Sequence, residues 1–357
     1  MSRRRTALVT AGLAAGVVAG GAVGKVVLAR RRSDPEAHEP LSILPPDVLE
    51  AVESFDGTRL AVRAAGDPGR PTIVFVHGFS LDMTTWHYQW TGLSERFRCV
   101  LFDLRSHGRS EAALSGDLSV EAMGRDLAAV LERVAPGRAV VVGHSIGAMS
   151  ILSMASSRPD LLERSVAGTA FVGAAASDLL RGAMGSVTQL LRPRLGSLTQ
   201  AARRVDRLRR YVLSVPTDVA GLVARITQFG PDASPHLVSY VVGLAARAPG
   251  AVWTDGLAGL MGVDLRDALR RVTVPSLVMV GEHDRVTPPS SAVLMAGELP
   301  DARLAVIEAA GHMAMLERHE DVNERLGAFV EEVLGGRSAR GVAGDVGAPP
   351  SGRRSRS

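Results

Sequence analysis

The chain has 357 residues and a formal net charge of +4, and 40 of its 41 basic residues are arginine. The one lysine, Lys25, lies in a leader-like segment near the N-terminus. Schiff-base catalysis and phosphate binding by a P-loop lysine both need an amine at a folded site, and arginine does not release its proton near neutral pH. The composition therefore excludes lysine-based chemistry.

The excess positive charge lies at the two ends of the chain. Residues 1–32 contain seven basic and no acidic residues, and residues 336–357 contain five basic residues and one acidic residue. Residues 33–335 contain 29 basic and 36 acidic residues, so this middle region is acidic. A basic total would suggest nucleic-acid binding, but the positive excess lies outside the region expected to fold. We therefore expect no nucleic-acid partner.

The middle region is long enough for one large α/β domain with an insertion, or for two smaller domains. Its one cysteine, Cys99, lies in an apolar run and cannot form an internal disulfide. The chain thus has neither a disulfide framework nor a zinc-type cysteine cluster. We expect Cys99 to be a small buried core residue.

The first 32 residues form a leader with an apolar centre. Three arginines precede the uncharged stretch 6–24, and Lys25 and three further arginines follow it. These 19 uncharged residues match the roughly 20 that a helix needs to cross a bilayer, which predicts a single-pass N-terminal anchor in the cell membrane. The alternative is secretion after signal cleavage, because Val27-Leu28-Ala29 resembles a cleavage site. Both flanks are basic, so the orientation stays open.

Residues 33–46 are rich in proline and acidic residues and are interpreted as a linker. A hairpin is then expected around Asp56-Gly57, and short apolar strands alternate with helical stretches after it. The expected strands are Thr72–Val76, 99–102, 139–142, 165–172, 276–280 and 303–307, and the expected helices are 85–95, 119–134, 148–157 and His319–Leu334. This alternation predicts a mostly parallel sheet with helices on both faces.

The alternation is interrupted at residues 174–262, where such strands are missing. We interpret this region as a helical cap, or lid, inserted into a core made of 47–173 and 263–335. Five arginines at residues 203–210 follow a helical spacing and predict a basic amphipathic helix, which either contacts anionic lipid or an acidic substrate or is a solvated face. The tail, 336–357, is rich in Gly, Pro, Ser and Arg and is expected to be disordered.

The sequence G-H-S-I-G at residues 143–147 carries the strongest chemical signal. It lies between an expected strand and an expected helix, where a sharp turn strains the backbone and side chains at Gly143 and Gly147 would collide with neighbouring structure. Ser145 is then exposed at the N-terminus of the helix. Because a serine hydroxyl is a poor nucleophile on its own, a histidine and an orienting carboxylate are needed beside it.

Two later loops provide such residues. Asp284 follows the expected strand 276–280, and His312 follows the expected strand 303–307. Ligands bind at the carboxyl ends of the strands in open α/β sheets. We therefore expect Ser145, Asp284 and His312 to lie together at that edge of the sheet.

From about residue 56 to residue 334, interrupted by the cap, these motifs resemble those of the α/β-hydrolase family. The resemblance implies an α/β-hydrolase fold with a mostly parallel eight-stranded sheet, helices on both faces and an inserted helical cap. It also implies roles for the three residues. Ser145 is the nucleophile, His312 is the base and then the acid, and Asp284 fixes the tautomer of His312.

The resemblance further implies an oxyanion hole made of the backbone N–H groups of Phe79 and Ile146. Phe79 lies directly after the strand Thr72–Val76, where the family carries its His-Gly-x turn. Asp264 and Asp267 are the alternatives to Asp284 as the acidic residue of the triad, because some members of the family carry this residue earlier in the chain. The residues expected to support the site through their motifs are His77, Gly78, Gly143, His144 and Gly147.

Three histidines and one loop neighbour these positions. His77, His144 and His283 are expected to form local hydrogen bonds in the floor of the active site rather than to transfer protons. The sequence D-L-R-S-H-G-R-S at 103–110 resembles the family's D-x-R-G-x-G-x-S loop, with Ser106 where glycine is usual. Its aspartate and arginine are expected to brace the loop.

These features predict a serine hydrolase that cleaves carboxylic esters through an acyl-enzyme, with no metal or organic cofactor. A cap with few aromatic residues predicts an aliphatic pocket, and hence small-molecule or lipid esters with aliphatic acyl or alkyl chains. Ser145 argues against epoxide hydrolases and haloalkane dehalogenases, which use an aspartate nucleophile. Carbon–carbon bond hydrolases, thioesterases, lactonases, acyltransferases and perhydrolases share the triad and remain alternatives, and a non-catalytic binding protein of this fold is a further class. The oligomeric state stays open.

Overall fold

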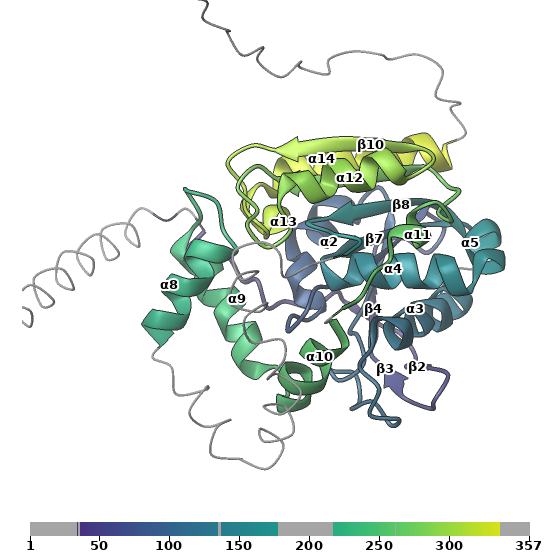
Figure 1. Cartoon of the computed structure of the whole chain (residues 1–357), viewed down its shortest axis with the longest axis horizontal. Helices are drawn as coiled ribbons and strands as arrows, with labels where there is room; N and C mark the ends of the chain where they lie inside the picture. The colour runs from purple at the N-terminus through teal and green to yellow at the C-terminus, as the bar shows by residue number, and fades with distance from the viewer. Residues whose placement is uncertain (1–33, 35, 135–136, 178–216, 261, 336–357) are drawn as a thin grey trace, which may run out of the picture.

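The computed structural model describes residues 34, 36–134, 137–177, 217–260 and 262–335. Within these residues the centre is an eight-stranded sheet in the order β1-β4-β6-β5-β7-β8-β9-β10 (Figure 1). Its strands are β1 (Asp47–Val48), β4 (Val62–Ala65), β5 (Thr72–Val76), β6 (Arg98–Phe102), β7 (Ala139–His144), β8 (Val166–Val172), β9 (Ser276–Gly281) and β10 (Ala302–Ile307). The β1–β4 and β4–β6 pairs are antiparallel and the other pairs are parallel. The mostly parallel sheet is thus confirmed.

Helices cover both faces of this sheet. They are the short 3-10 helix η1 (Met83–Trp86), α2 (His87–Leu93), α3 (Val120–Val134), α4 (Ile146–Ser157), α5 (Pro159–Ser165), α11 (Arg266–Leu269), α12 (Pro289–Glu298), α13 (Ala314–Glu317) and α14 (His319–Leu334). Buried residues of α3, α4, α5 and α12 form one core with Val74 and Val76, and buried residues of α2, α13 and α14 form the other with Ile73 and Phe75. Successive residues of β5 face opposite cores, which explains why this strand is an unbroken apolar run.

The predicted elements agree with the structure at most strands and differ where prolines begin helices. β5 and α14 have the predicted bounds. The hairpin at Asp56-Gly57 joins two short antiparallel strands, β2 (Val52–Glu53) and β3 (Arg59–Leu60). The helices α5 and α12 were not predicted, and each has a proline, Pro159 or Pro289, in its first turn. Proline suits that position because its fixed φ matches the helix and its missing N–H has no partner to lose.

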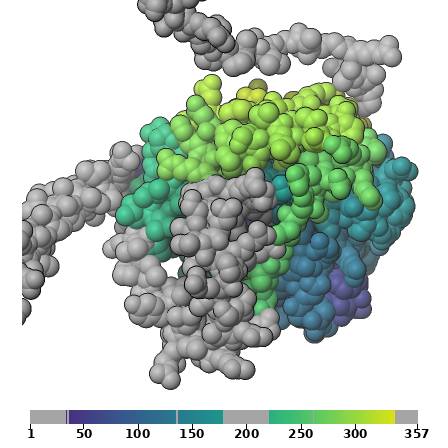
Figure 2. Space-filling view, in the orientation of Figure 1, coloured from purple at the N-terminus to yellow at the C-terminus, as the bar shows by residue number. Residues whose placement is uncertain are grey.

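Between β8 and β9 lies the segment that we interpret as the cap, and its two ends pair with each other. Ser177 pairs with Asp264 in an antiparallel bridge, and the Leu265 N–H donates to the Ala176 carbonyl at 2.7 Å. The described cap elements are α8 (Thr217–Thr227), α9 (Pro235–Arg247), the π-helical turn η2 (Val252–Gly256) and α10 (Leu257–Leu260). In the space-filling view the green residues of the cap border the yellow-green C-terminal elements (Figure 2).

Part of the segment interpreted as a linker folds onto the cap. Leu41 is only 2% exposed, and its carbonyl accepts a hydrogen bond from the hydroxyl of Tyr240 in α9 at 3.2 Å. The Asp34 carboxylate accepts a hydrogen bond from Ser234 Oγ at 2.8 Å, at the N-terminus of α9. The linker interpretation is therefore wrong for these residues. The high content of proline and acidic residues in this segment did not indicate that Leu41 is buried.

Three predicted segments lie outside the described residues: the leader, the arginine-rich stretch of the cap and the C-terminal tail. The membrane anchor therefore stays a prediction. Of the helices that the structure describes, none is both long and apolar enough to cross a membrane.

A buried ion network fixes the loop after β6 to the core. Arg105 is fully buried, and its Nε and Nη2 atoms donate to the two carboxylate oxygens of Asp126 at 2.7 and 2.6 Å. Its Nη1 atom donates to Asp56 Oδ2 at 3.1 Å. This bidentate hydrogen bonding offsets the free energy that the guanidinium loses when it is removed from water. Arg105 therefore braces the loop, as the sequence indicated.

We expect Asp126→Asn to lower the free energy of unfolding by about 3–5 kcal/mol, because the buried guanidinium of Arg105 loses its main counter-charge. Urea unfolding followed by circular dichroism measures the change. Glu331→Gln is the control, because Glu331 pairs with Arg96 at 2.6 Å while both side chains are about half exposed. Its expected loss is below ~1 kcal/mol. Similar losses in the two variants would contradict the stabilising role of the network.

Candidate active site

Ser145 stands at the sharp turn between β7 and α4. Its backbone has φ 52° and ψ −114°, in a region that residues other than glycine rarely adopt. The Ser145 N–H donates to the carbonyl of Val172, the last residue of β8, at 3.1 Å. Strained backbone of this kind persists only where the surroundings fix it, and it is concentrated at functional sites.

The two glycines of the G-H-S-I-G sequence make this turn possible. A Cβ on Gly143 would lie 2.6 Å from the backbone nitrogen of Ala148. A Cβ on Gly147 would lie 2.4 Å from the carbonyl oxygen of Val76, at the end of β5. Both distances are too short for real contacts. The first turn of α4 therefore packs directly against the end of β5. The sequence motif predicted close packing at the two glycines but did not identify β5 as the neighbouring structure.

His312 and Asp284 form a hydrogen-bonded pair. The distance between His312 Nδ1 and Asp284 Oδ2 is 2.9 Å, and both residues are at least 95% buried. Asp284 lies in the loop after β9, and His312 lies in the loop after β10. If Nδ1 carries the proton and donates it to the carboxylate, Nε2 keeps a lone pair and can act as a base.

Asp284 is held by the loop that follows it. Its Oδ1 accepts hydrogen bonds from the N–H groups of Val286 and Thr287, both at 2.8 Å, and its Oδ2 accepts one from the Thr287 hydroxyl at 2.7 Å. Burial alone would raise the pKa of Asp284, but the neighbouring His312 and these hydrogen bonds outweigh it and lower the pKa. The carboxyl group therefore stays ionised beside the histidine. The sequence analysis gave Thr287 no role, although it stands three residues after Asp284.

The predicted oxyanion donors lie at the ends of neighbouring strands. Ile146 is the first residue of α4, so its N–H is among those that have no acceptor within the helix. Phe79 follows β5, which pairs directly with β7. The packing of Gly147 on Val76 brings the two turns together. The oxyanion hole stays a prediction.

Two of the three neighbouring histidines form local hydrogen bonds under these turns. His77 Nδ1 donates to the Gly78 carbonyl at 2.8 Å while its Nε2 accepts from the Leu104 N–H at 3.0 Å. Burial, with His107 nearby, lowers the pKa of His77 to about 3. His144 Nε2 donates to the carbonyl of His312 at 3.1 Å, and burial lowers its pKa well below the ordinary value. Both rings are therefore neutral and hold loops in place.

His283 does not belong to this floor, and the expectation for it is wrong. Its side chain is 43% exposed and lies 3.6 Å from the carboxylate of Glu282. Only its neighbour Asp284 turns inward. In a tight loop after a strand, adjacent residues point in different directions, so closeness in sequence did not imply closeness to the site.

His107 is a contributor that the sequence analysis missed. Its Nδ1 donates to the Arg105 carbonyl at 2.9 Å, and its Nε2 accepts from the N–H of Ser80 at 3.3 Å. Ser80 adjoins Phe79 and has a positive φ of 58°. His107 therefore ties the Phe79 turn to the loop that Arg105 braces. The sequence placed this histidine in a recognised loop but gave no sign of its distant partner.

Ser106 adopts the backbone that glycine would adopt at its position. Its φ is 61°, and its hydroxyl accepts a hydrogen bond from the Ala113 N–H at 3.0 Å. In the same loop, Asp103 accepts hydrogen bonds from the N–H groups of Met83 and Arg109, both at 2.7 Å. The departure from the family pattern therefore leaves the loop geometry intact, because the serine side chain supplies a bond that glycine lacks.

The cap contacts the Phe79 turn through an aromatic pair. The rings of Phe79 and Trp253 meet edge to face, with centroids 5.3 Å apart and planes at 89°. Trp253 lies in η2, a π-helical turn, and such turns often mark functional sites. Trp253 is thus one of the few aromatic residues of the cap, and it lies at this junction.

The alternative acids lie elsewhere. Asp264 binds the exposed Arg266 side chain at 2.9 Å, and Asp267 belongs to α11 on the outer surface. Both line a surface depression of about 310 Å³ together with Arg270. Asp284, which directly contacts His312, is therefore the carboxylate that fits the role of the acid.

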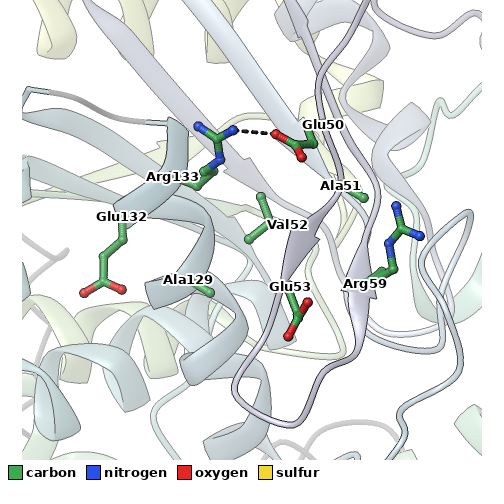
Figure 3. Close-up of a pocket in the computed structure, with 8 residues that line it drawn as sticks. All are labelled: Glu50, Ala51, Val52, Glu53, Arg59, Ala129, Glu132 and Arg133. Atoms are coloured by element: carbon green, nitrogen blue, oxygen red, sulfur yellow. Dashed lines mark hydrogen bonds and ion pairs between the residues drawn. The ribbon is translucent and has the colours of Figure 1, made fainter.

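One surface depression lies away from Ser145, Asp284 and His312. It has a volume of about 650 Å³ and lies between the β2–β3 hairpin and α3 (Figure 3). Glu50 and Arg133 form an ion pair at 2.5 Å across it, and both side chains are more than 60% exposed. The residues that line the depression include no buried, hydrogen-bonded pair of polar side chains and no residue with a strained backbone. The candidate active site is therefore identified by its hydrogen bonds and not by the size of a cavity. Within the described ranges, no three His, Cys, Asp or Glu side chains are grouped so that they could hold a metal ion.

Comparison with known proteins agrees with this geometry. Residues 73–325 match the Alpha/beta hydrolase family. The chain is 26% identical over 244 residues to a 2-(acetamidomethylene)succinate hydrolase of Mesorhizobium japonicum, which covers 68% of this chain and 81% of that protein. It is 27% identical over 287 residues to a non-heme chloroperoxidase of Streptomyces lividans, covering 79% and 100% of the two chains. The solved structure of an esterase from Thermogutta terrifontis has a similar fold, with a TM-score of 0.65 at 23% identity, covering 80% of this chain and 99% of that one. Since the family match spans more than half of the chain, including Ser145, Asp284 and His312, the protein belongs to the α/β-hydrolase family.

Proposed function

We propose that the protein is a serine hydrolase that cleaves carboxylic esters through an acyl-enzyme. The observation that carries the proposal is the buried 2.9 Å contact between His312 and Asp284, at the same edge of the sheet as the strained Ser145. In this assignment Ser145 is the nucleophile, His312 the general base and Asp284 the residue that orients it. The family membership supports the same roles.

In the first half of the reaction, Ser145 attacks the ester carbonyl while His312 Nε2 takes the proton from its hydroxyl. The ionised Asp284 stabilises the imidazolium that forms, because its lowered pKa keeps the negative charge in place. The N–H groups of Phe79 and Ile146 would bind the oxyanion. Each such donor typically contributes about 3–4 kcal/mol to the stability of the transition state.

His312 then gives this proton to the leaving alcohol, which completes the acyl-enzyme. In the second half, His312 takes a proton from a water molecule that attacks the acyl carbonyl, and returns it to Ser145 Oγ as the carboxylic acid leaves. His77, His107 and His144 do not compete for this task, because each ring is hydrogen-bonded to the backbone through at least one nitrogen and burial lowers its pKa. His312 is the histidine whose partner is a carboxylate within the site.

For the substrate we propose esters with aliphatic acyl or alkyl chains. The apolar composition of the cap supports this choice, and the pair of Phe79 and Trp253 adds an aromatic edge where the cap meets the oxyanion turn. Lactones, thioesters and carbon–carbon bonds are alternative substrates for the same triad. The similarity to a non-heme chloroperoxidase favours perhydrolase activity as a second candidate.

The nucleophile is tested by labelling with a fluorophosphonate probe. We expect the wild-type protein to label and Ser145→Ala to remain unlabelled, because phosphonylation requires the activated serine hydroxyl. Intact mass spectrometry measures the adduct. Labelling of Ser145→Ala at the wild-type rate, or an inert wild-type protein, would remove the basis for a serine hydrolase.

The role of Asp284 as the acidic residue of the triad is tested by Asp284→Asn, with Asp264→Asn as the matched control. The first change removes the charge that fixes the tautomer of His312, so we expect kcat to fall by about 10³- to 10⁴-fold. The second removes an exposed carboxylate that pairs only with the surface residue Arg266 among the described contacts, so activity should not change. A large loss in the control, with none in Asp284→Asn, would reassign the acid.

The substrate class is tested with p-nitrophenyl esters of increasing acyl length. Each methylene buried in an apolar pocket contributes ~0.8 kcal/mol, or about fourfold in kcat/KM, until the pocket is filled. We expect such a rise from acetate to medium-length chains, measured by release of p-nitrophenol. A flat profile, or faster turnover of lactones or thioesters, would count against an aliphatic esterase.

A further inference from the structure

One buried carboxylate lies beside the base but outside the proposed triad. Glu317 is the last residue of α13, five residues after His312, and is only 6% exposed. Lone buried glutamates are rare, because removing a carboxylate from water is costly without hydrogen bonds. Its partners therefore indicate what it does.

Each oxygen of Glu317 accepts a hydrogen bond from a different part of the chain. Oε1 accepts from the N–H of Gly311 at 2.8 Å, and Gly311 directly precedes His312. Oε2 accepts from the N–H of Gly230 at 2.7 Å, in the cap loop between α8 and α9. One side chain thus joins the loop of the base to the cap.

The two loops that Glu317 joins are also in close contact. The N–H of Met313 donates to the carbonyl of Gln228 at 3.2 Å. A Cβ on Gly230 would lie 2.3 Å from the carbonyl oxygen of Ala309, so only glycine allows this approach. The cap loop therefore covers the backbone on both sides of His312. A shift of either loop would change the position of the imidazole ring.

The charged groups that face Glu317 come from three elements. Arg318 follows it in the chain, Arg225 belongs to α8, and Glu36 belongs to the N-terminal segment. Burial raises the pKa of Glu317 from 4.5 to about 7, although the two N–H donors and the two arginines act in the opposite direction. The ionised carboxylate accepts both hydrogen bonds, whereas the protonated acid has a donor on one oxygen and keeps one of them.

We propose that Glu317 is a positioning residue that ties the His312 loop to the cap and so holds the base in its working position. This inference rests on the proposed function, because it assigns His312 as the base. Glu317 itself does not touch the reacting atoms. Its role is to keep Gly311, and with it the imidazole, at a fixed distance from Ser145.

The test compares the full-length wild type with Glu317→Gln, whose amide has only one acceptor oxygen for the two N–H groups. At pH 8.5 we expect kcat on an alkyl ester to fall by about 10- to 100-fold, since a small displacement of a catalytic group has effects of that size. KM should change little. The loss should be smaller on p-nitrophenyl esters, whose leaving group needs less help from a correctly placed acid.

The pH dependence separates positioning from mere stabilisation. The ratio of wild-type to variant kcat removes the pH effects that both proteins share. We expect this ratio to rise from near unity at pH 5.5 to its full value at pH 8.5, as Glu317 ionises. Because its pKa is raised in the folded state, its contribution to the free energy of unfolding is present at acid pH and is lost as the pH rises toward about 7. Stability and activity therefore change in opposite directions.

Glu320→Gln is the matched control, because Glu320 is an exposed glutamate three residues further along. It should match the wild type throughout. If Glu317→Gln does not fold, Glu317→Asp takes its place, since its shorter side chain reaches only one of the two N–H groups. Equal losses on both ester classes, or a ratio that does not vary with pH, would overturn the positioning role. A wild type that neither hydrolyses esters nor labels with fluorophosphonate would instead overturn the proposed function.

Discussion

The close approach of α4 to the end of β5 is the constraint on which the site depends. It is possible only because Gly147 has no side chain, and it brings the first turn of a helix against a neighbouring strand. The chain can enter that helix only through the strained backbone of Ser145. The same approach brings Ile146 to the turn that contains Phe79. The position of Ser145 and the proposed position of the oxyanion donors therefore follow from one packing contact.

The histidines around this contact are all buried but differ in their hydrogen-bond partners. His77, His107 and His144 each lie in the interior, where a charged imidazole is disfavoured, and each holds a backbone carbonyl or N–H group. His312 differs because its partner is Asp284, a carboxylate that the loop keeps ionised. A charge beside the ring can stabilise the imidazolium, whereas a backbone carbonyl contributes much less. His312, the proposed base, is thus distinguished from the other three histidines by its partner rather than by its burial.

The sequence predicts those parts of the fold and site that depend on local patterns. The apolar run of β5 has the predicted bounds because both its faces are buried, and the glycines beside Ser145 mark the turn because sterics exclude other residues there. Glu317 and His107 were missed because each binds a backbone N–H group on a distant segment, Gly230 or Ser80, and such a contact leaves no pattern in the sequence. The N-terminal segment was misread for a similar reason: its proline-rich composition conceals the buried Leu41.

The cap is attached to both sides of the proposed reaction centre. On the side of the oxyanion donors, Trp253 packs edge to face on Phe79. On the side of the proposed base, the Glu317 carboxylate accepts one hydrogen bond from Gly230 in the cap and another from the His312 loop. These contacts lie on different cap elements, η2 and the loop before α9, so a rigid displacement of the described cap would strain both sides together. The cap therefore helps to position both the Phe79 turn and the His312 loop, and under the proposed function substrate preference and turnover should be coupled through it.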